Sequence, residues 1–426
     1  MILSPISYLD CIVFCIFLAP QLVIRVGLFE TISVVLQCLP FLLLELPYSF
    51  IRERYLTKHG DQSSFVRQAS PFEDFVIRCV RYAFANIHPS VGRVFFSKQV
   101  ALPFLRFRML RHGYIMSPVH WHEHEDYIYR DASLEKVSGY LDNTDPTKRP
   151  DLCVYYAHGK GKSNALRSGI IMAADHIQGG GFSMGSSYFY LEFLLSWLDL
   201  LKKAGYENPS IFALEYTLVP DDSFPKQLEE AIAGYDHVLS TVGDSWRVCV
   251  GGDSAGATII LNLLLHLANM GHQADVMDGI GQWQLPKPAL AVLISPWVSL
   301  VSDKHHNTRS DYLDAGNLHI YAEEYAGDDL SPHDPLLSPG QNRDIDWWRR
   351  ATPDHGFFVA YGNEEVLAPE TEGLIQFWKK GDIKVVDRRE TGGIHAWPVA
   401  SLFLSESNKR LTGLKAIVQE IRNNIE

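Results

Sequence analysis

Hydrophobic positions follow two different patterns along the chain. Near the N-terminus lie two long apolar runs, residues 11–24 and 28–50, with few charges. From residue 151 onward, short runs of β-branched and aromatic residues alternate with longer segments of helical periodicity. This alternation predicts an α/β domain built on a mostly parallel sheet. We expect strands at 152–157, 289–294, 357–361 and 383–386, and helices at 188–201, 227–239 and 407–423.

The two N-terminal runs predict a membrane element. A transmembrane helix needs about 20 apolar residues, and the first run reaches that length only by extending across Asp10. The second run is interrupted by Glu30, Pro40 and Glu45. A re-entrant hairpin and one tilted helix fit equally well, and buried helices of a soluble protein are the alternative. No Lys or Arg precedes the first run, which argues against a cleavable signal peptide.

Three regions follow from these patterns. We expect a membrane-anchor segment at 1–58, a helical cap or linker with the first strands at 59–150, and a catalytic domain at 151–426. Ser70, Pro71 and Glu73 have the pattern of a helix start, in which the glutamate can return a bond to the cap. Aromatic and basic residues mix over 91–110, as in a segment that covers a site or leans on a bilayer.

The composition of the chain argues against nucleic-acid binding and against a metal site. The net charge of −12 argues against a nucleic-acid surface, and the six cysteines lack zinc-site or disulfide spacing. The stretch 120–126 places His120, His122 and His124 at alternating positions, which could align three imidazoles on a strand. Nothing else supports a metal site there, so we interpret the stretch as a polar strand or loop. We expect neither a metal nor an organic cofactor.

The stretch around Ser254 contains a candidate catalytic serine. A β-branched run enters Gly252-Asp253-Ser254-Ala255-Gly256 and leaves into a long apolar helix-forming segment. This strand-turn-helix context is typical of a nucleophile elbow. Glycines at 252 and 256 let the strand and helix approach closely, while the serine hydroxyl points out of the sheet. The amide of Ala255, at a helix N-terminus, is one candidate oxyanion donor.

Several further motifs resemble the hormone-sensitive-lipase-like branch of the α/β-hydrolases. They are His158-Gly159 with Gly180-Gly181-Phe182, then the run 215–220 with Phe224-Pro225, and Ser295-Pro296-Trp297. The apolar N-terminus makes the chain similar to membrane-anchored arylacetamide and steryl-acetate deacetylases and related fungal hydrolases. The fold implied is an α/β-hydrolase sandwich with an N-terminal helical cap and a membrane anchor.

The same resemblance implies site roles. Ser254 is the expected nucleophile, Glu365 the acid and His395 the base, with Glu364 as the fallback acid. The oxyanion hole is expected from the amides of Gly180, Gly181 and Ala255. In the resulting reaction a histidine accepts the serine proton and a carboxylate orients the imidazole.

The expected activity is that of a membrane-associated serine carboxylesterase or deacetylase, which hydrolyses a hydrophobic ester through an acyl-enzyme. Its partners are the ester and membrane lipid, not nucleic acid, and the oligomeric state is open. We expect a membrane location at the endoplasmic reticulum, on a side that stays undetermined. An amidase would use the same intermediate. The alternative from another class is an inactive hydrolase-like binding protein tethered to a membrane.

Residues 160–179 interrupt the family motif. Removing Lys160 to Gly179 would restore an uninterrupted His-Gly-Gly-Gly-Phe sequence, and Gly159-Lys160 can be encoded by a splice-donor sequence. We therefore hypothesise a translated intron, with a genuine surface loop as the rival explanation. For the chain as written, the interruption predicts an exposed, poorly ordered loop and impaired or absent activity, because errors of about 1 Å in a catalytic turn are costly.

Overall fold

The structure is a computed structural model of the 426-residue chain. It describes residues 1–115, 121–130, 133–143, 148–160, 181–274, 285–406 and 408–425. The predicted loop at 160–179 lies outside these residues except for Lys160, so its expected disorder stays a prediction.

One eight-stranded sheet organises the molecule, in the order β1-β2-β4-β3-β5-β6-β7-β8. Six neighbouring strands, from β4 to β8, are parallel, while β2 pairs antiparallel with both β1 and β4. The predicted mostly parallel sheet is therefore confirmed. The strands are β1 (Trp121–Arg130), β2 (Ser133–Asn143), β3 (Leu152–Lys160), β4 (Pro209–Thr217), β5 (Val248–Asp253), β6 (Leu290–Ile294), β7 (Phe357–Gly362) and β8 (Val385–Glu390).

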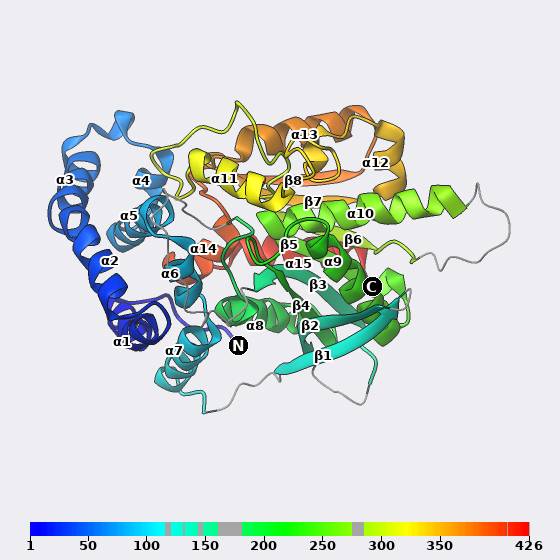
Figure 1. The fold of residues 1–426 in the computed structure, drawn as a ribbon, viewed down its shortest axis with the longest axis horizontal. Helices are drawn as coiled ribbons and strands as arrows, with labels where there is room; N and C mark the ends of the chain where they lie inside the picture. Colours follow the sequence, from blue (N-terminus) through cyan, green and yellow to red (C-terminus); the bar gives the residue numbers. More distant parts are fainter. Residues whose placement is uncertain are drawn as a thin grey trace.

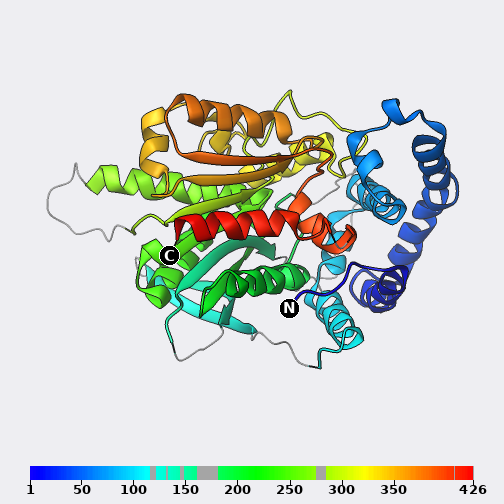
Figure 2. The same cartoon turned by 180° about the vertical axis from the view of Figure 1, so that it is seen from behind.

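Helices cover both faces of this sheet, which gives two separate cores. Alternate residues of β3 divide between them: Tyr155 faces one core and Tyr156 the other. This alternation is the period of two expected of a strand buried on both sides. Figure 2 shows α8 and α15 in front of the sheet, and Figure 1 shows α9 to α13 on the opposite face. The helices are α8 (Ser187–Lys203), α9 (Lys226–Val242), α10 (Ala255–Ala274), α11 (Ala315–Ala326), α12 (Ile345–Ala351), α13 (Ala368–Lys380), α14 (Trp397–Leu404) and α15 (Thr412–Asn424).

Seven N-terminal helices gather at one end of the sheet (Figure 1). They are α1 (Tyr8–Arg25), α2 (Leu28–Pro40), α3 (Leu46–Ile51), α4 (Ser64–Gln68), α5 (Pro71–Asn86), α6 (Pro89–Phe95) and α7 (Lys98–Arg111). Two helical stretches, Tyr8–Arg25 and Leu28–Leu56, are long and apolar enough to cross a membrane, and 11% of the most apolar 18-residue window of each is buried. Length and composition alone are weak evidence, because some core helices and signal sequences share them.

The predicted start of α5 is confirmed, with one difference. The Ser70 hydroxyl accepts a hydrogen bond from the amide of Glu73 at 3.1 Å. The Glu73 carboxylate accepts one from the Ser405 hydroxyl at 2.8 Å, where the sequence suggested a return bond to the cap. This contact ties α5 to the end of α14, so the tertiary partner replaces the local one.

Candidate active site

Ser254 occupies a strained turn between β5 and α10. Its φ is 52°, a left-handed value that costs a non-glycine residue about 1–3 kcal/mol. The close approach predicted for the flanking glycines is present: a methyl group at Gly256 would lie 2.2 Å from the carbonyl oxygen of Ala157. The Ser254 amide donates to the Ile294 carbonyl at 3.0 Å, and the Trp297 amide donates to the Ser254 carbonyl at 3.3 Å. The turn is thereby held from the neighbouring strand β6.

Glu365 and His395 face one another where the chain leaves β7 and β8. The Oε2 atom of Glu365 lies 3.6 Å from Nδ1 of His395, and both side chains are buried. This separation is longer than a hydrogen bond, so the attraction is electrostatic. The other oxygen of Glu365 accepts from the Ser295 hydroxyl at 2.6 Å and from the Gly362 amide at 2.5 Å. Among the described residues, no hydrogen bond joins the Ser254 hydroxyl to the imidazole.

The surroundings of His395 favour its protonated form. Burial lowers the pKa of the imidazole, but the facing Glu365 carboxylate and the charges of Asp311 and Asp253 outweigh that effect, so the pKa is raised from its usual 6.5. With Nδ1 directed at Glu365, Nε2 is the nitrogen left to accept a proton. The arrangement suits a base that must be stabilised as it becomes an imidazolium.

Glu364, the fallback acid, turns away from His395. Its carboxylate accepts hydrogen bonds from the Phe65 amide at 3.2 Å and from the Ser310 hydroxyl. The contact with Phe65 ties the loop after β7 to α4. The geometry therefore favours Glu365 as the residue that orients the imidazole.

Two residues of this site had no predicted role. The Ser295 hydroxyl bridges both halves of the pair, because it donates to Glu365 and accepts from the Ala396 amide at 2.9 Å. The fully buried Asp311 carboxylate accepts from the amides of His395 at 3.0 Å and Val366 at 2.8 Å. Ser295 belongs to the Ser295-Pro296-Trp297 motif, which contributed to the family resemblance but had no predicted role in the site. Asp311 lies in none of the motifs that the sequence analysis singled out.

The expected oxyanion turn is described only in part, since Gly180 lies outside the described residues. Gly181 packs against Trp297: a methyl group added to this glycine would lie 2.6 Å from Cζ3 of the indole. Phe182 follows with a φ of 52° and stacks on Tyr325 at 3.8 Å. Across the site, Ala255 begins α10, where a first-turn amide has no partner within the helix.

Arg93 of α6 holds this turn from the N-terminal side. Its Nε donates to the carbonyl of Ser183 at 2.9 Å, and its Nη1 lies 3.2 Å from the Asp221 carboxylate. Gly92 lies so near the turn that a methyl group there would reach within 1.8 Å of the Met184 sulfur. The region predicted as cap or linker therefore contacts the turn that follows Gly181.

A third buried acid, Asp253, directly precedes Ser254 in the elbow. Asp253 accepts hydrogen bonds from the hydroxyls of Tyr156 and Tyr190, each at 2.7 Å, and lies 3.8 Å from Nδ1 of His158. Burial raises the pKa of Asp253, but His158 and the two tyrosines more than offset this, so the net direction is downward. A carboxylate kept ionised here contributes to the raised pKa of His395.

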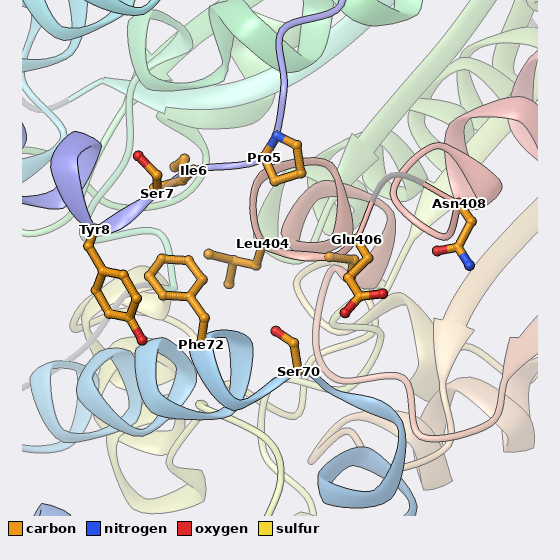
Figure 3. A pocket seen from close by; sticks show the side chains of 10 residues that line it. Pro5, Ile6, Ser7, Tyr8, Ser70, Phe72, Leu404, Glu406 and Asn408 are labelled. Atoms are coloured by element: carbon orange, nitrogen blue, oxygen red, sulfur yellow. The ribbon is translucent and has the colours of Figure 1, made fainter.

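A cavity of about 630 Å³ opens away from these residues. Figure 3 shows its lining where the start of α1, the start of α5 and the end of α14 meet. Tyr8, Phe72 and Leu404 form its apolar wall, with Ser70 and Glu406 beside them. None of the candidate catalytic residues lines it, so its position does not bear on the chemistry at Ser254.

Comparison with known proteins places this geometry in a family. Residues 176–399 match the alpha/beta hydrolase fold family. The chain is 30% identical to an acetyl-hydrolase of Streptomyces hygroscopicus over 227 residues, which cover 52% of this chain and 67% of that protein. It is 23% identical to steryl acetyl hydrolase 1 of Saccharomyces cerevisiae over 212 residues, 45% of this chain and 44% of that one.

A solved structure supports the fold. The crystal structure of an esterase from the bacterial hormone-sensitive lipase family aligns with a TM-score of 0.57 at 19% identity, over 84% of this chain and 99% of that one. The expected likeness to that branch and to steryl-acetate hydrolases is confirmed. With a family match over more than half of its length, the chain belongs to the alpha/beta hydrolase fold family.

Proposed function

We propose that this chain is a membrane-associated serine carboxylesterase that removes a short acyl group, such as acetyl, from a hydrophobic alcohol. The observation that carries the proposal is the strained elbow at Ser254 on the same sheet edge as the buried Glu365–His395 pair. The names of the acetyl-hydrolase and the steryl acetyl hydrolase support the acyl group and the alcohol. The endoplasmic reticulum stays a prediction from the resemblance.

The reaction follows from these roles. The Ser254 oxygen attacks the ester carbonyl while Nε2 of His395 takes the serine proton, and Glu365 stabilises the resulting imidazolium. The oxyanion is bound by the amides of Ala255 and the Gly180–Gly181 turn, each donor contributing about 3 kcal/mol. The intermediate collapses when the imidazolium returns its proton to the departing alcohol. Water, deprotonated by the imidazole, then releases the acid and regenerates Ser254.

Covalent labelling with a fluorophosphonate probe tests the nucleophile. The wild-type protein and a form lacking residues 160–179 are compared with Ser254→Ala in each background, and a thermal unfolding transition verifies that every form is folded. Labelling that disappears in Ser254→Ala supports the serine hydrolase. Absence of labelling in both folded backgrounds would overturn it.

A specific feature favours the alternative of an inactive, membrane-tethered binding protein. The interruption at 160–179 enters the family's oxyanion motif between Gly159 and Gly180. If only the shortened form reacts with the probe, the full chain is an inactive form of an active enzyme. Sequencing the transcript decides between the two origins: a major message that keeps these codons contradicts the intron hypothesis.

A further inference from the structure

The apolar segment from α1 to Leu56 exposes hydrophobic side chains along its whole length. Large hydrophobic side chains recur along it, and each of the following is more than half exposed: Ile16, Ile24, Phe29, Leu36, Leu43 and Leu56. Soluble proteins rarely expose so many apolar side chains along one segment without a partner. Figure 1 shows this segment at the end of the molecule, outside the layer formed by α5 to α7.

The segment is bonded to the body of the protein before its first apolar turn. Arg410 donates to the Leu3 carbonyl, and Arg108 donates to the Ser4 carbonyl at 2.6 Å. On α1 itself, Asp10 is fully buried, 3.3 Å from Arg108 and 2.6 Å from Arg111. Such a buried charge network is costly to break, because each ion would be left unpaired.

The far end of the segment is bonded to the same body. Glu53 pairs with Arg78 of α5 at 2.8 Å, and Arg54 donates to the Ala69 carbonyl at 2.7 Å. Both ends therefore lie on one side of any bilayer that the segment enters. A single crossing, which would separate residues 3–10 from residues 53–54, is incompatible with these contacts.

The middle of the segment also lies against the protein. Phe14 packs on Phe95 of α6, with ring centroids 4.5 Å apart. Phe41 stacks on Tyr82 of α5 at 4.0 Å, and the Tyr82 hydroxyl donates to the Gln37 carbonyl at 3.1 Å. A hairpin crossing the bilayer twice would lose these contacts or carry α5 and its charged residues into hydrocarbon.

The remaining charges favour shallow insertion. Glu30 and Glu45 are exposed among the apolar residues, and an acidic residue costs about 3 kcal/mol at the centre of a bilayer but little near its surface. Arg52 and Lys58 are exposed at the end of the segment, and Arg106 is exposed on α7, which packs against α1. Cations at the border of an apolar face complement anionic headgroups.

We propose that residues 8–56 form a one-sided membrane-binding surface, which lies in a single leaflet of an anionic bilayer and does not span it. This inference rests on the membrane association in the proposed function and specifies its geometry. It differs from a single-helix anchor, because the segment is bonded to the rest of the protein near both ends and in its middle.

Vesicle flotation tests whether this face binds lipid. The full chain is mixed with vesicles of phosphatidylcholine and phosphatidylserine, and the double variant Phe29→Glu/Leu43→Glu is compared with Leu336→Glu, an exposed leucine on the catalytic domain. We expect the double variant to bind at least about tenfold more weakly and Leu336→Glu to bind normally. No flotation of the wild-type chain, with dimers that the double variant abolishes, would overturn the proposal in favour of a second copy of the chain.

Single cysteines test whether the segment crosses the bilayer. In a variant with Cys11, Cys15, Cys38 and Cys79 replaced by serine, Glu30→Cys marks the first turn of α2, and Lys380→Cys marks the catalytic domain. We expect a membrane-impermeant maleimide enclosed in the vesicles to leave both cysteines unmodified. Modification of Glu30→Cys from inside would show a spanning hairpin. Fluorophosphonate labelling of Ser254 in detergent is measured in parallel, so that failure of the esterase proposal is distinguished from failure of the membrane geometry.

Discussion

Replacing Asp311 by asparagine tests two effects of this residue. Its hydrogen bonds position the loops of His395 and Glu365, and its charge contributes to the raised pKa of His395. In the described part of the chain, both oxygens of Asp311 accept backbone N–H donors alone: Oδ1 those of His395 and Tyr312, and Oδ2 that of Val366. The carboxylate thus joins the loop that carries His395 to the loop that carries Glu365. We expect it to act as a positioning residue through these loops.

The hydrogen bonds of Asp311 determine how much stability and activity the Asp311→Asn variant should lose. Asparagine keeps one accepting oxygen, but its amide group meets a second N–H donor, and a buried donor without a partner costs about 1–3 kcal/mol. We expect that loss of stability in thermal or urea unfolding. Displacement of Glu365 relative to His395 by a fraction of an ångström to about 1 Å should lower kcat roughly tenfold to a hundredfold.

The pH dependence of activity measures the effect of the Asp311 charge on the pKa of His395. The negative charge of Asp311 contributes to the raised pKa of His395, and only the neutral imidazole can act as base. Without that charge the pKa falls, so the acid limb of kcat/KM for a chromogenic ester moves to lower pH. The activity ratio of Asp311→Asn to wild type should therefore increase as the pH falls through the wild-type pKa.

Glu364→Gln is the matched control. This neighbouring acid is not among the groups that contribute most to the raised pKa of His395, so its replacement should leave the acid limb nearly in place. The measurements use whichever form, with or without residues 160–179, reacts with the probe. An acid limb of Asp311→Asn identical to wild type would refute the electrostatic role, and unchanged kcat and stability would refute the positional one.

Three further substitutions test other parts of the structure. Glu365→Gln should lower kcat by about a hundredfold or more and shift the acid limb to lower pH, because the facing carboxylate raises the pKa of His395; an unchanged pH profile would reassign the acid. Gly181→Ala should lower kcat about a hundredfold with a smaller change in KM, because its methyl group would meet Trp297 at 2.6 Å; full activity would remove this turn from the oxyanion hole. Asp10→Asn should destabilise the fold by about 3 kcal/mol in urea unfolding, since it breaks the buried pair with Arg108, and unaltered stability would contradict the docked position of α1.

The fold and the strained turn at Ser254 were predictable because their signals are local. A β-branched run, two glycines and an apolar helix mark the elbow at Ser254 within about twenty residues of sequence. The loops after β7 and β8 follow from strand periodicity, and this places Glu365 and His395 at the carboxyl edge of the sheet. Parallel strands bring those ends together, so their proximity could be expected before any distance was known.

Asp311 and Ser295 were not predictable in the same way. Their roles arise from hydrogen bonds to backbone amides 84 and 101 residues away along the chain, and no periodicity reports such contacts. The sequence also could not decide between Glu364 and Glu365. The two residues are adjacent and identical, and only the backbone conformation determines which carboxylate faces His395. For the N-terminal segment, the apolar composition could be read from the sequence. Its contacts with the rest of the protein could not, because they depend on Arg108 and Arg78 in later helices.

One helical layer connects the apolar surface with the catalytic loop. On one side α5 pairs with the segment through Arg78, and on the other its Arg81 donates to the Asp311 carbonyl at 2.7 Å. Phe84 at the end of α5 packs on Tyr312, which in turn packs on the His395 ring at 5.7 Å. A shift of α5 would thus reach both the acid that positions His395 and the ring that covers it. Because packed side chains transmit displacement with little compression, we expect a displacement of α5 at the apolar segment to reach the loop of Asp311 and His395.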